Sequence, residues 1–282
     1  MRIWITGARG HLGGRLLDIL SSDHDIIGTG SADLDVTDFA AVQRFTRDTR
    51  PDLIIHSAAW TDVDGCANDP DRAVTVNGFG AQHVALAASA VGVPILYIST
   101  NEVFDGESRQ PYREYDPPHP INPYGYSKWV GERAVMTLNP RHYIVRTSWV
   151  FAHGGKNFVQ TMLNAARAGK SLRVVTNEIA SPTYNHDLAD ATAALIQTER
   201  FGVYHFTNAG VCSRWQFARY ILDRAGFIDT PIMPILSHQW QRPSTPPLYT
   251  PLANHAGRLI GVELRHWQTA VDAFLEREGL LA

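Results

Sequence analysis

The chain of 282 residues has little of what several classes of protein depend on. Its two cysteines, Cys66 and Cys212, cannot build a disulfide framework, and its histidines show no spacing suited to a metal ion. With 28 acidic and 25 basic residues, no excess of charge indicates nucleic acid or a membrane surface as a partner. The longest apolar stretch, 84–98, is too short and too interrupted to span a bilayer. We therefore expect a cytoplasmic protein with no metal, no nucleic acid and no membrane contact.

Lysine is also scarce. Of the 25 basic residues only Lys128, Lys156 and Lys170 are lysines, and all others are arginines. Arginine cannot replace lysine where a compact ammonium group must reach two partners at once. Because this chain otherwise uses arginine, a lysine that stands in a recognisable pattern is a candidate for chemistry, and Lys128 is in such a pattern.

What the first half of the chain does have is a regular alternation of strand-like and helix-like segments. Its strand-like runs are almost wholly apolar, as buried parallel strands are. This alternation predicts an α/β fold of the Rossmann type, a doubly wound parallel sheet between layers of helices. The expected strands are 2–6, 25–28, 52–56, 94–99 and 143–150, and the expected helices are 12–20, 73–91 and 127–136.

The alternation is less regular after residue 150, where a smaller C-terminal lobe packed on the sheet is expected. No clean linker separates the two parts, 1–150 and 151–282. The second part is expected to contain helices at 157–168, 187–197, 214–225 and 264–278, strands at 172–175 and 203–206, and a proline-rich structured loop at 231–251.

A glycine-rich turn stands between the first strand and the first helix. Gly7, Gly10 and Gly13 are spaced so that one makes a tight turn, one lets a pyrophosphate approach the backbone and one lets the helix pack on the strand. The N-terminus of the helix then offers free N–H groups to phosphate. We interpret the turn as a dinucleotide site; the alternative is a merely flexible turn.

The choice of dinucleotide depends on the residues after the second strand. An acidic residue there would bind a ribose 2′-hydroxyl and favour NAD, but no acid occurs before Asp33. Arg9 and Ser31 are suited to a 2′-phosphate, which favours NADP(H) and leaves NAD(H) open. The alternative for Arg9 is a solvated loop charge.

Tyr124 and Lys128 are four residues apart in the run YGYSK, so a helix would place them on one face. Reduction of a ketone needs an acid at the oxygen, and a nearby ammonium group favours the phenolate and lowers the pKa of a tyrosine. Thr100, at the end of a predicted strand, is suited to hydrogen-bond the same oxygen. The alternatives are a surface helix pair for Tyr124 and Lys128 and strand capping for Thr100.

Together, the glycine turn, Ser57–Ala59, Asn77, Ser99–Thr100 and the Tyr124–Lys128 pair resemble the extended short-chain dehydrogenase/reductase family. Within it the chain is similar to the dTDP-4-dehydrorhamnose reductases. The motifs that carry this second resemblance are STNEVF (99–104), NPYGYSK (122–128), RTSWVF (146–151), KNF (156–158) and SPT (181–183), in that order.

The resemblance implies a role for each matching residue. Tyr124 would be the proton donor, Lys128 its modulator and Thr100 the partner of the carbonyl group. The residues implied at the cofactor are Gly7, Gly10, His11, Leu12 and Gly13 at the phosphates, Asp35 and Val36 at the adenine, Ala58 and Ala59 at the ribose and nicotinamide, and Asn77, which is equally well read as an ordinary polar helix residue.

The resemblance also implies a sugar-nucleotide pocket, and here the chain departs from the family. The usual strand end reads Ser-Thr-Asp-Tyr-Val-Phe, whereas this chain has Asn101 and Glu102 in the third and fourth places. Trp149 either stacks on the ligand or is an ordinary core tryptophan. The residues implied in the pocket are Thr61, Val63, Thr100, Asn101, Glu102, Trp149 and Arg242, the last from an Arg-Pro motif.

These observations predict an NAD(P)-dependent reductase in which 1–150 binds the dinucleotide and carries the catalytic residues, and 151–282 mainly binds substrate. The expected reaction is hydride transfer to the C4 ketone of a deoxy-sugar nucleotide, dTDP-4-dehydrorhamnose to dTDP-rhamnose. The alternatives are an epimerase or dehydratase on the same fold, to which Glu102 lends weight, and a non-catalytic NADP-binding regulatory subunit. A nucleotide sugar is the expected partner, and a homodimer is left open.

Overall fold

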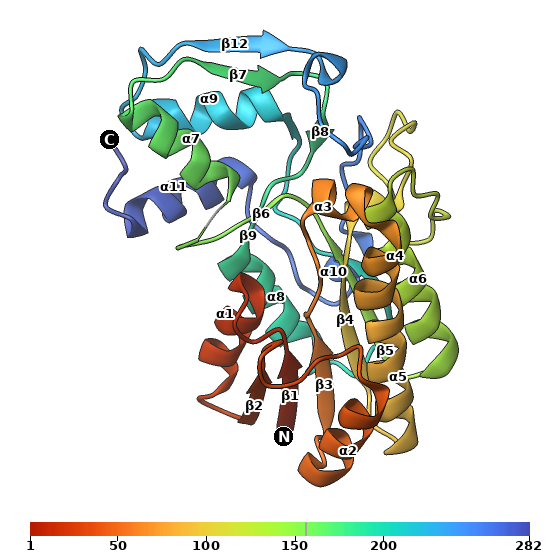
Figure 1. Ribbon diagram of the computed structural model, residues 1–282. Helices are drawn as coiled ribbons and strands as arrows, with labels where there is room; N and C mark the ends of the chain where they lie inside the picture. Colours follow the sequence, from red (N-terminus) through yellow and green to blue (C-terminus); the bar gives the residue numbers. More distant parts are fainter. Residues whose placement is uncertain (156) are drawn as a thin grey trace.

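The computed structural model describes residues 1–155 and 157–282, so Lys156, the first residue of the KNF motif, lies outside the described residues. A parallel sheet of six strands forms the base of the molecule (Figure 1), in the order β10-β5-β4-β3-β1-β2. The strands are β1 (Arg2–Thr6), β2 (Asp25–Thr29), β3 (Leu53–His56), β4 (Ile95–Thr100), β5 (His142–Thr147) and β10 (Gly202–His205).

The order of the strands fixes where a ligand can bind. From β1 the chain first adds β2 on one side and then β3 on the other, so β1 and β3 are neighbours whose connecting segments diverge. In open parallel sheets such a switch point leaves a crevice at the carboxyl ends of the strands. The glycine turn comes directly after β1 and Ser57–Ala59 directly after β3, so both open onto this crevice.

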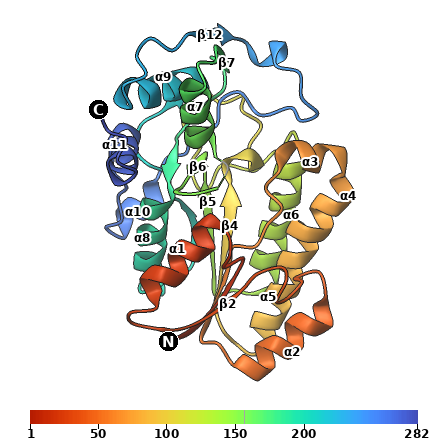
Figure 2. The same ribbon diagram turned by 60° about the vertical axis from the view of Figure 1, so that its left-hand side comes forward.

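Helices cover both faces of the sheet (Figure 2), and each face has its own apolar core. Ile3, Ile5 and Leu96 face one core and Trp4, Ile54 and Tyr97 face the other, because successive strand residues point to opposite faces. The first face is covered by α1 (His11–Leu20), α8 (Asn185–Leu195) and α10 (His255–Leu259), and the second by α2 (Phe39–Thr49), α5 (Gly80–Ala90) and α6 (Pro123–Leu138).

Above the sheet lies a smaller lobe (Figure 1), built around a third apolar core that includes Phe217, Trp267 and Phe274. Its helices are α7 (Phe158–Arg167), α9 (Arg214–Arg224) and α11 (Trp267–Arg277). Three ladders of two strands complete it: β7 (Leu172–Val175) with β12 (Ile232–Ile235), β8 (Ile179–Ala180) with β11 (Cys212–Ser213), and β6 (Val150–Phe151) with β9 (Thr183–Tyr184).

Short helical turns link the larger elements. Val74–Phe79 is a π-helical turn, a form that often marks functional sites, and it runs directly into α5. No helix among residues 1–155 and 157–282 is long and apolar enough to cross a membrane. The other short turns are α3 (Val63–Asn68), α4 (Pro70–Ala73), the 3-10 turn Asn101–Val103 and the 3-10 turn Ser237–Gln239.

The predicted doubly wound parallel sheet is confirmed, with differences of detail. The helix expected at 127–136 begins earlier, at Pro123, because Asn122 caps it and proline is favoured in a first turn. The proline-rich stretch contains β12, whose register places Pro234 opposite Val174. The sixth strand of the sheet and α8 come from beyond residue 150, so the division at that residue remains a prediction.

Candidate active site

The glycine turn packs so closely against neighbouring backbone that a side chain would not fit at two of its positions. Gly7 has φ of 68°, and a Cβ atom there would lie 2.7 Å from the amide nitrogen of Ala58. A Cβ at Gly13 would collide with the carbonyl oxygen of Gly7. The N-terminus of α1, at Gly10, has no side-chain cap, so its N–H groups are free for an anion. The bare backbone and the uncapped helix therefore fit the diphosphate of a dinucleotide.

A crevice of about 470 Å³ extends from this turn past the ends of β1, β2 and β3. Trp60, Arg72 and Val76 also line it, although the sequence did not single them out, and the guanidinium of Arg72 lies 4.6 Å from the ring centre of Trp60. The predicted cofactor residues along this crevice are Gly7, Arg9, Gly10, Ser31, Asp35, Val36, Ala58 and Ala59.

Arg9 lies at the rim of the crevice and already has a partner. Its Nη2 atom is 2.7 Å from Oδ1 of Asp33, whose other oxygen accepts a hydrogen bond from the amide of Gly30 at 2.8 Å. The pair is largely exposed, so solvent weakens it. Arg9 is therefore neither buried nor free, and a 2′-phosphate there would compete with Asp33 for it.

A second crevice, also about 470 Å³, begins at the same glycine turn and contains the predicted catalytic residues. Thr100 reaches it from the end of β4, and Tyr124 and Lys128 reach it from the first turns of α6. Gly125 makes this approach possible, since a Cβ there would collide with the carbonyl oxygen of Glu102. Gly7, Gly10, Ser57 and Ala59 line both crevices, so the dinucleotide site leads directly to the catalytic residues.

Lys128 is buried beneath this crevice. Its Nζ atom lies 4.1 Å from the ring centre of Tyr97, a cation–π contact, and the imidazole of His56 stacks on the same tyrosine ring at 5.6 Å. Burial lowers the pKa of Lys128 to about 7, against the attraction of Glu132. The pKa of His56 falls to about 3, through burial first and then the charge of Lys128, so His56 is neutral.

The pKa of Tyr124 is shifted in the direction opposite to the expected one. Burial raises its pKa above the usual value for tyrosine, the charge of Glu102 raises it further, and a hydrogen bond with Thr100 opposes both. The expected lowering by Lys128 is not seen, because burial of the phenol outweighs other influences. Tyr124 is therefore a protonated phenol at neutral pH, which is the form a proton donor needs.

Asn77 lies behind the crevices and lines neither of them. Its side chain is fully buried and accepts a hydrogen bond from the amide of Trp60 at 2.7 Å. It donates to the carbonyl oxygen of Trp60 at 3.0 Å and to the hydroxyl of Ser127 at 2.9 Å. Asn77 thus joins the segment after β3 to the helix that carries Lys128, and its contact with the cofactor stays a prediction.

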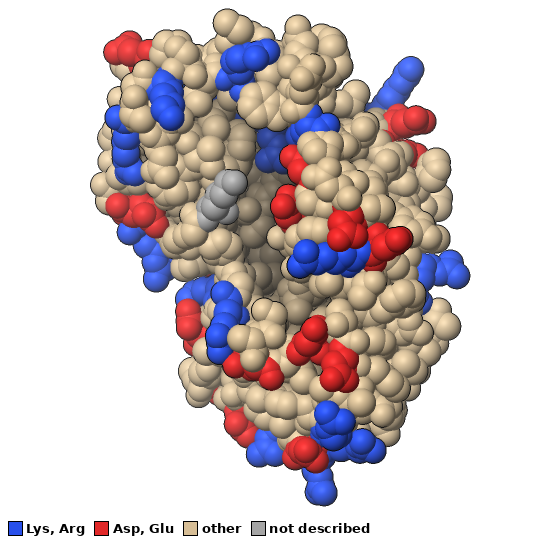
Figure 3. All heavy atoms as spheres, in the orientation of Figure 1, with Lys and Arg blue, Asp and Glu red and all other residues tan. Residues whose placement is uncertain are grey.

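The predicted substrate-binding residues other than Thr100 meet in a pocket of about 210 Å³ between the sheet and the smaller lobe. Figure 3 shows the hollow on this face, with basic and acidic side chains along its sides. Thr61, Val63, Asn101, Glu102, Trp149 and Arg242 all line the pocket, and all except Arg242 also line the catalytic crevice. Residues that the sequence did not indicate are Asp62, Asp64, Glu178, Arg214, Ser244, Pro246, Pro247 and Thr250.

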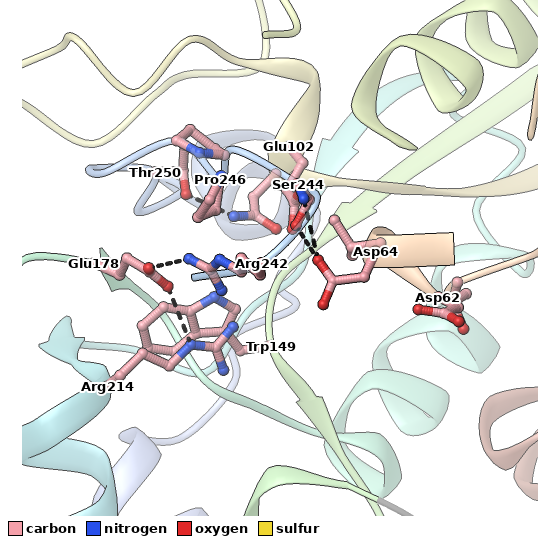
Figure 4. A pocket seen from close by; sticks show the side chains of 14 residues that line it. Asp62, Asp64, Glu102, Trp149, Glu178, Arg214, Arg242, Ser244, Pro246 and Thr250 are labelled. Atoms are coloured by element: carbon pink, nitrogen blue, oxygen red, sulfur yellow. Dashed lines mark hydrogen bonds and ion pairs between the residues drawn. The ribbon is translucent and has the colours of Figure 1, made fainter. Parts of the chain in front are cut away.

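Charged side chains of both signs line this pocket (Figure 4): the arginines Arg214 and Arg242, and the acids Asp62, Asp64, Glu102 and Glu178. Arg214 lies 3.6 Å from the ring centre of Trp149, and both Arg214 and Arg242 form ion pairs with the buried Glu178. Trp149 has φ of 43°, which a bulky residue rarely adopts and which often accompanies function. Arg214 and Glu178 were missed because no local motif marks them: the folding of the smaller lobe brings them here.

Several polar groups of the catalytic crevice have no partner within the described residues. The buried hydroxyl oxygens of Ser99, Thr147 and Ser148 make no hydrogen bond there. Buried polar atoms are seldom left unsatisfied unless a ligand or water completes them. Residues 1–155 and 157–282 contain no group of three or more metal-ligating side chains.

A dinucleotide cradle at the switch point of a parallel sheet, with a half-buried tyrosine and a buried lysine beside it, defines an oxidoreductase of the short-chain dehydrogenase/reductase class. The family model described as RmlD substrate binding domain matches residues 1–279, and the chain belongs to this family. The resemblance found in the motifs is thereby confirmed.

Individual proteins are similar over nearly the whole chain. SpsK, a spore coat polysaccharide biosynthesis protein of Bacillus subtilis, is 37% identical over 98% of this chain and 97% of its own. The crystal structure of a dTDP-4-dehydrorhamnose reductase from Clostridium acetobutylicum has a TM-score of 0.96 at 36% identity, covering 99% of this chain and 100% of the other. That of a dTDP-4-dehydrorhamnose reductase from Bacillus anthracis, in complex with NADP, has a TM-score of 0.93 at 36% identity, covering 98% and 99%.

Proposed function

We propose that the protein reduces the C4 ketone of a deoxy-sugar nucleotide, converting dTDP-4-dehydrorhamnose to dTDP-rhamnose with NADPH, or with NADH. The observation that carries the proposal is the meeting of Thr100, Tyr124 and Lys128 in a crevice that continues into both the dinucleotide cradle and the charged pocket. The names of the similar reductases, one of them an NADP complex, support it.

The chain's own residues would hold the cofactor in an extended form. The backbone of the glycine turn and the N-terminus of α1 bind the diphosphate, with Asp35 and Val36 at the adenine end and Ala59 toward the catalytic end. When bound, the nicotinamide supplies the hydride. Lys128 lines the same crevice as Tyr124 and would reach both the ribose beside the nicotinamide and the phenol of Tyr124.

Tyr124 and Thr100 would together protonate and orient the ketone oxygen. Thr100 orients the ketone oxygen by a hydrogen bond, and Tyr124 transfers its proton to that oxygen as hydride reaches the carbon. The positive charge of Lys128 then stabilises the phenolate and assists the return of a proton to it. The raised pKa of Tyr124 keeps the proton in place until the substrate takes it.

The charged pocket would bind the nucleotide. Arg214 and Arg242 can contact the diphosphate of a nucleotide sugar, and the ring of Trp149 offers a surface on which a sugar or base can stack. Asn101 is held by a hydrogen bond from its Nδ2 atom to the hydroxyl of Thr250 at 2.6 Å, which fixes the wall nearest Thr100.

The decisive experiment replaces Tyr124 by phenylalanine. We expect Tyr124→Phe to lower NADPH oxidation with dTDP-4-dehydrorhamnose by roughly 10²- to 10⁴-fold, the usual contribution of a general acid, while NADPH still binds. Absorbance at the nicotinamide band measures the rate, and quenching of protein fluorescence measures cofactor binding.

Tyr126→Phe is the matched control for this experiment. Tyr126 lies two residues further along the same helix and is 48% exposed. It lines neither of the two crevices nor the charged pocket, so its replacement should leave the rate unchanged. Full turnover by Tyr124→Phe would remove that residue from the reaction. Binding of NADPH without turnover of any keto-sugar nucleotide by the unaltered protein would favour a regulatory subunit.

We also propose that the protein acts in the cytoplasm and forms a homodimer. Both cysteines are free and buried, which suits a reducing compartment. Light scattering after gel filtration measures the mass, and a single-chain mass at micromolar concentration would contradict the dimer.

A further inference from the structure

Glu102 stands at the junction of the catalytic crevice and the charged pocket, and it lines both. It comes two residues after Thr100, in the short 3-10 turn at the end of β4. In the proposed reduction Glu102 has no part, because Tyr124 supplies the only proton needed.

One oxygen of the Glu102 carboxyl group is held in place by a hydrogen bond. Its Oε2 atom accepts a hydrogen bond from Nδ2 of Asn122 at 2.7 Å. Asn122 is itself fixed, because its Oδ1 accepts from the amide of Gly125 at 2.8 Å and its Nδ2 also donates to the carbonyl oxygen of Thr245 at 3.2 Å. The same asparagine therefore positions the carboxylate and the start of the helix that carries Tyr124.

The carboxyl group has no ion-pair partner within residues 1–155 and 157–282. Arg214 and Arg242 line the same pocket, but both form their ion pairs with Glu178. Figure 4 shows Glu102 at the wall of the pocket, apart from the Glu178–Arg242 pair. Burial raises the pKa of Glu102, and the hydrogen bond from Asn122 and the two arginines oppose this only in part. A carboxyl group that lines a catalytic crevice and has no ion-pair partner there is a candidate for proton transfer.

We propose that Glu102 is a general base that removes a proton from a carbon next to the ketone, giving the protein a proton-exchange activity beside its reductase activity. The inference rests on the proposed function, because that function places a ketone oxygen between Thr100 and Tyr124. A ketone acidifies the C–H bonds of the two adjoining carbons, and Glu102 is the carboxylate closest in sequence to Thr100.

The step balances without an oxidant or reductant. The C–H bond breaks, its proton passes to the free oxygen of Glu102, and its electron pair forms a carbon–carbon double bond. The electrons of the C=O bond move onto the oxygen, where hydrogen bonds from Thr100 and Tyr124 stabilise the enolate. The reverse step returns a proton to the carbon. If Glu102 has exchanged its proton with solvent meanwhile, the product is the same sugar with a solvent-derived hydrogen.

The test is deuterium incorporation into dTDP-4-dehydrorhamnose in D₂O, detected by mass spectrometry. NADP⁺ is supplied in place of NADPH, so the cofactor site is filled and no reduction can consume the substrate. We expect incorporation faster than in the enzyme-free solution, and we expect Glu102→Gln to lower the enzyme-dependent rate roughly 10²-fold or more. Glutamine keeps the shape and can still accept from Asn122, whereas Glu102→Asp keeps a carboxylate and should retain measurable exchange.

Glu107→Gln is the matched control: this exposed glutamate lies in the same segment and lines neither the catalytic crevice nor the charged pocket, so its exchange rate should equal that of the unaltered protein. NADPH oxidation is measured on every variant, and for Glu102→Gln the ratio of exchange to reduction should fall at least tenfold. An unchanged ratio would overturn the proposal, as would wild-type incorporation no faster than the enzyme-free rate. Failure of the wild type to oxidise NADPH would instead overturn the reductase function, so the two failures are distinct.

Discussion

At the scale of the single residue, Lys128 combines a proposed catalytic role with a buried environment that is unfavourable for its charge. Burial lowers its pKa to about 7, far below the value near 10.5 of an unfolded chain. Between those two pH values the unfolded chain holds a proton that the folded protein has released, so the free energy of unfolding increases with pH across that range. Below pH 7 the folded protein buries the charged ammonium and bears the full desolvation cost.

We therefore expect Lys128→Met to be more stable than the unaltered protein at pH 6 and inactive in ketone reduction. Methionine fills the same space without a charge, so the gain should shrink as the pH rises through 7 toward 10.5. Thermal unfolding of both proteins at pH 6 and pH 9.5 measures this. An equal difference in melting temperature at the two pH values would show that desolvation of the ammonium is not the cause.

At the scale of the element, α6 carries the proposed catalytic pair and is fixed to the sheet by a buried ion pair. Arg146 on β5 donates to both carboxylate oxygens of Glu132 on α6, from Nε at 2.8 Å and from Nη2 at 2.7 Å. Both side chains are almost wholly buried. Arg146 also lies 5.1 Å from the ring centre of Phe104. This pair sets the distance of α6 from β5, and hence the depth of Lys128 one turn earlier.

Removing one side chain of the Glu132–Arg146 ion pair should lower the free energy of unfolding much more than removing both. We expect Glu132→Gln to lower the free energy of unfolding by about 3–5 kcal/mol, because it leaves the guanidinium of Arg146 buried without a counter-charge. The double variant Glu132→Gln, Arg146→Met should recover a large part of that loss. Urea unfolding curves of the unaltered protein, of the single variants Glu132→Gln and Arg146→Met, and of the double variant give the four free energies. A double variant as unstable as the sum of two single variants would contradict this expectation.

The first half of the molecule could be predicted from the sequence because its signals are local. The glycine turn, the spacing of Tyr124 and Lys128, and the apolar strands each occupy a few consecutive residues, so local patterns located them, although the start of the helix at Pro123 was missed. The helix α2 was missed because few of its residues are apolar: it lies at the surface and buries only Val42 and Thr46, although its apolar residues do gather on one face.

The charged pocket could be predicted only in part, because it is assembled over long distances in the chain. The contact of Arg214 with Trp149 and the pairing of both arginines with Glu178 depend on how the smaller lobe packs, and no local pattern encodes that. The lowered pKa of Lys128 and the raised pKa of Tyr124 were likewise out of reach, since burial is a property of the fold.

At the scale of the whole molecule, the two sites belong to different parts of the structure. The dinucleotide crevice is built by segments that come after β1, β2 and β3, whereas the charged pocket takes Glu178, Arg214 and Arg242 from the smaller lobe. Both sites open onto the catalytic crevice, which Arg214 also lines, but none of these three charged residues lines the dinucleotide crevice. A change in the smaller lobe should therefore affect the sugar nucleotide and not the cofactor.

We expect Arg214→Gln to raise the KM for the sugar nucleotide roughly 10- to 100-fold, about 1.4–2.8 kcal/mol, while the Kd of NADPH changes less than twofold. Glutamine loses both the charge offered to a diphosphate and the stacking on Trp149. Arg219→Gln is the matched control, because Arg219 lies on the same helix and pairs with Asp223. It lines neither of the two crevices nor the charged pocket. Steady-state kinetics and fluorescence titration measure the two constants. An equal loss of affinity for both ligands would mean that Arg214 acts through the packing of the lobe on the sheet and not through the nucleotide.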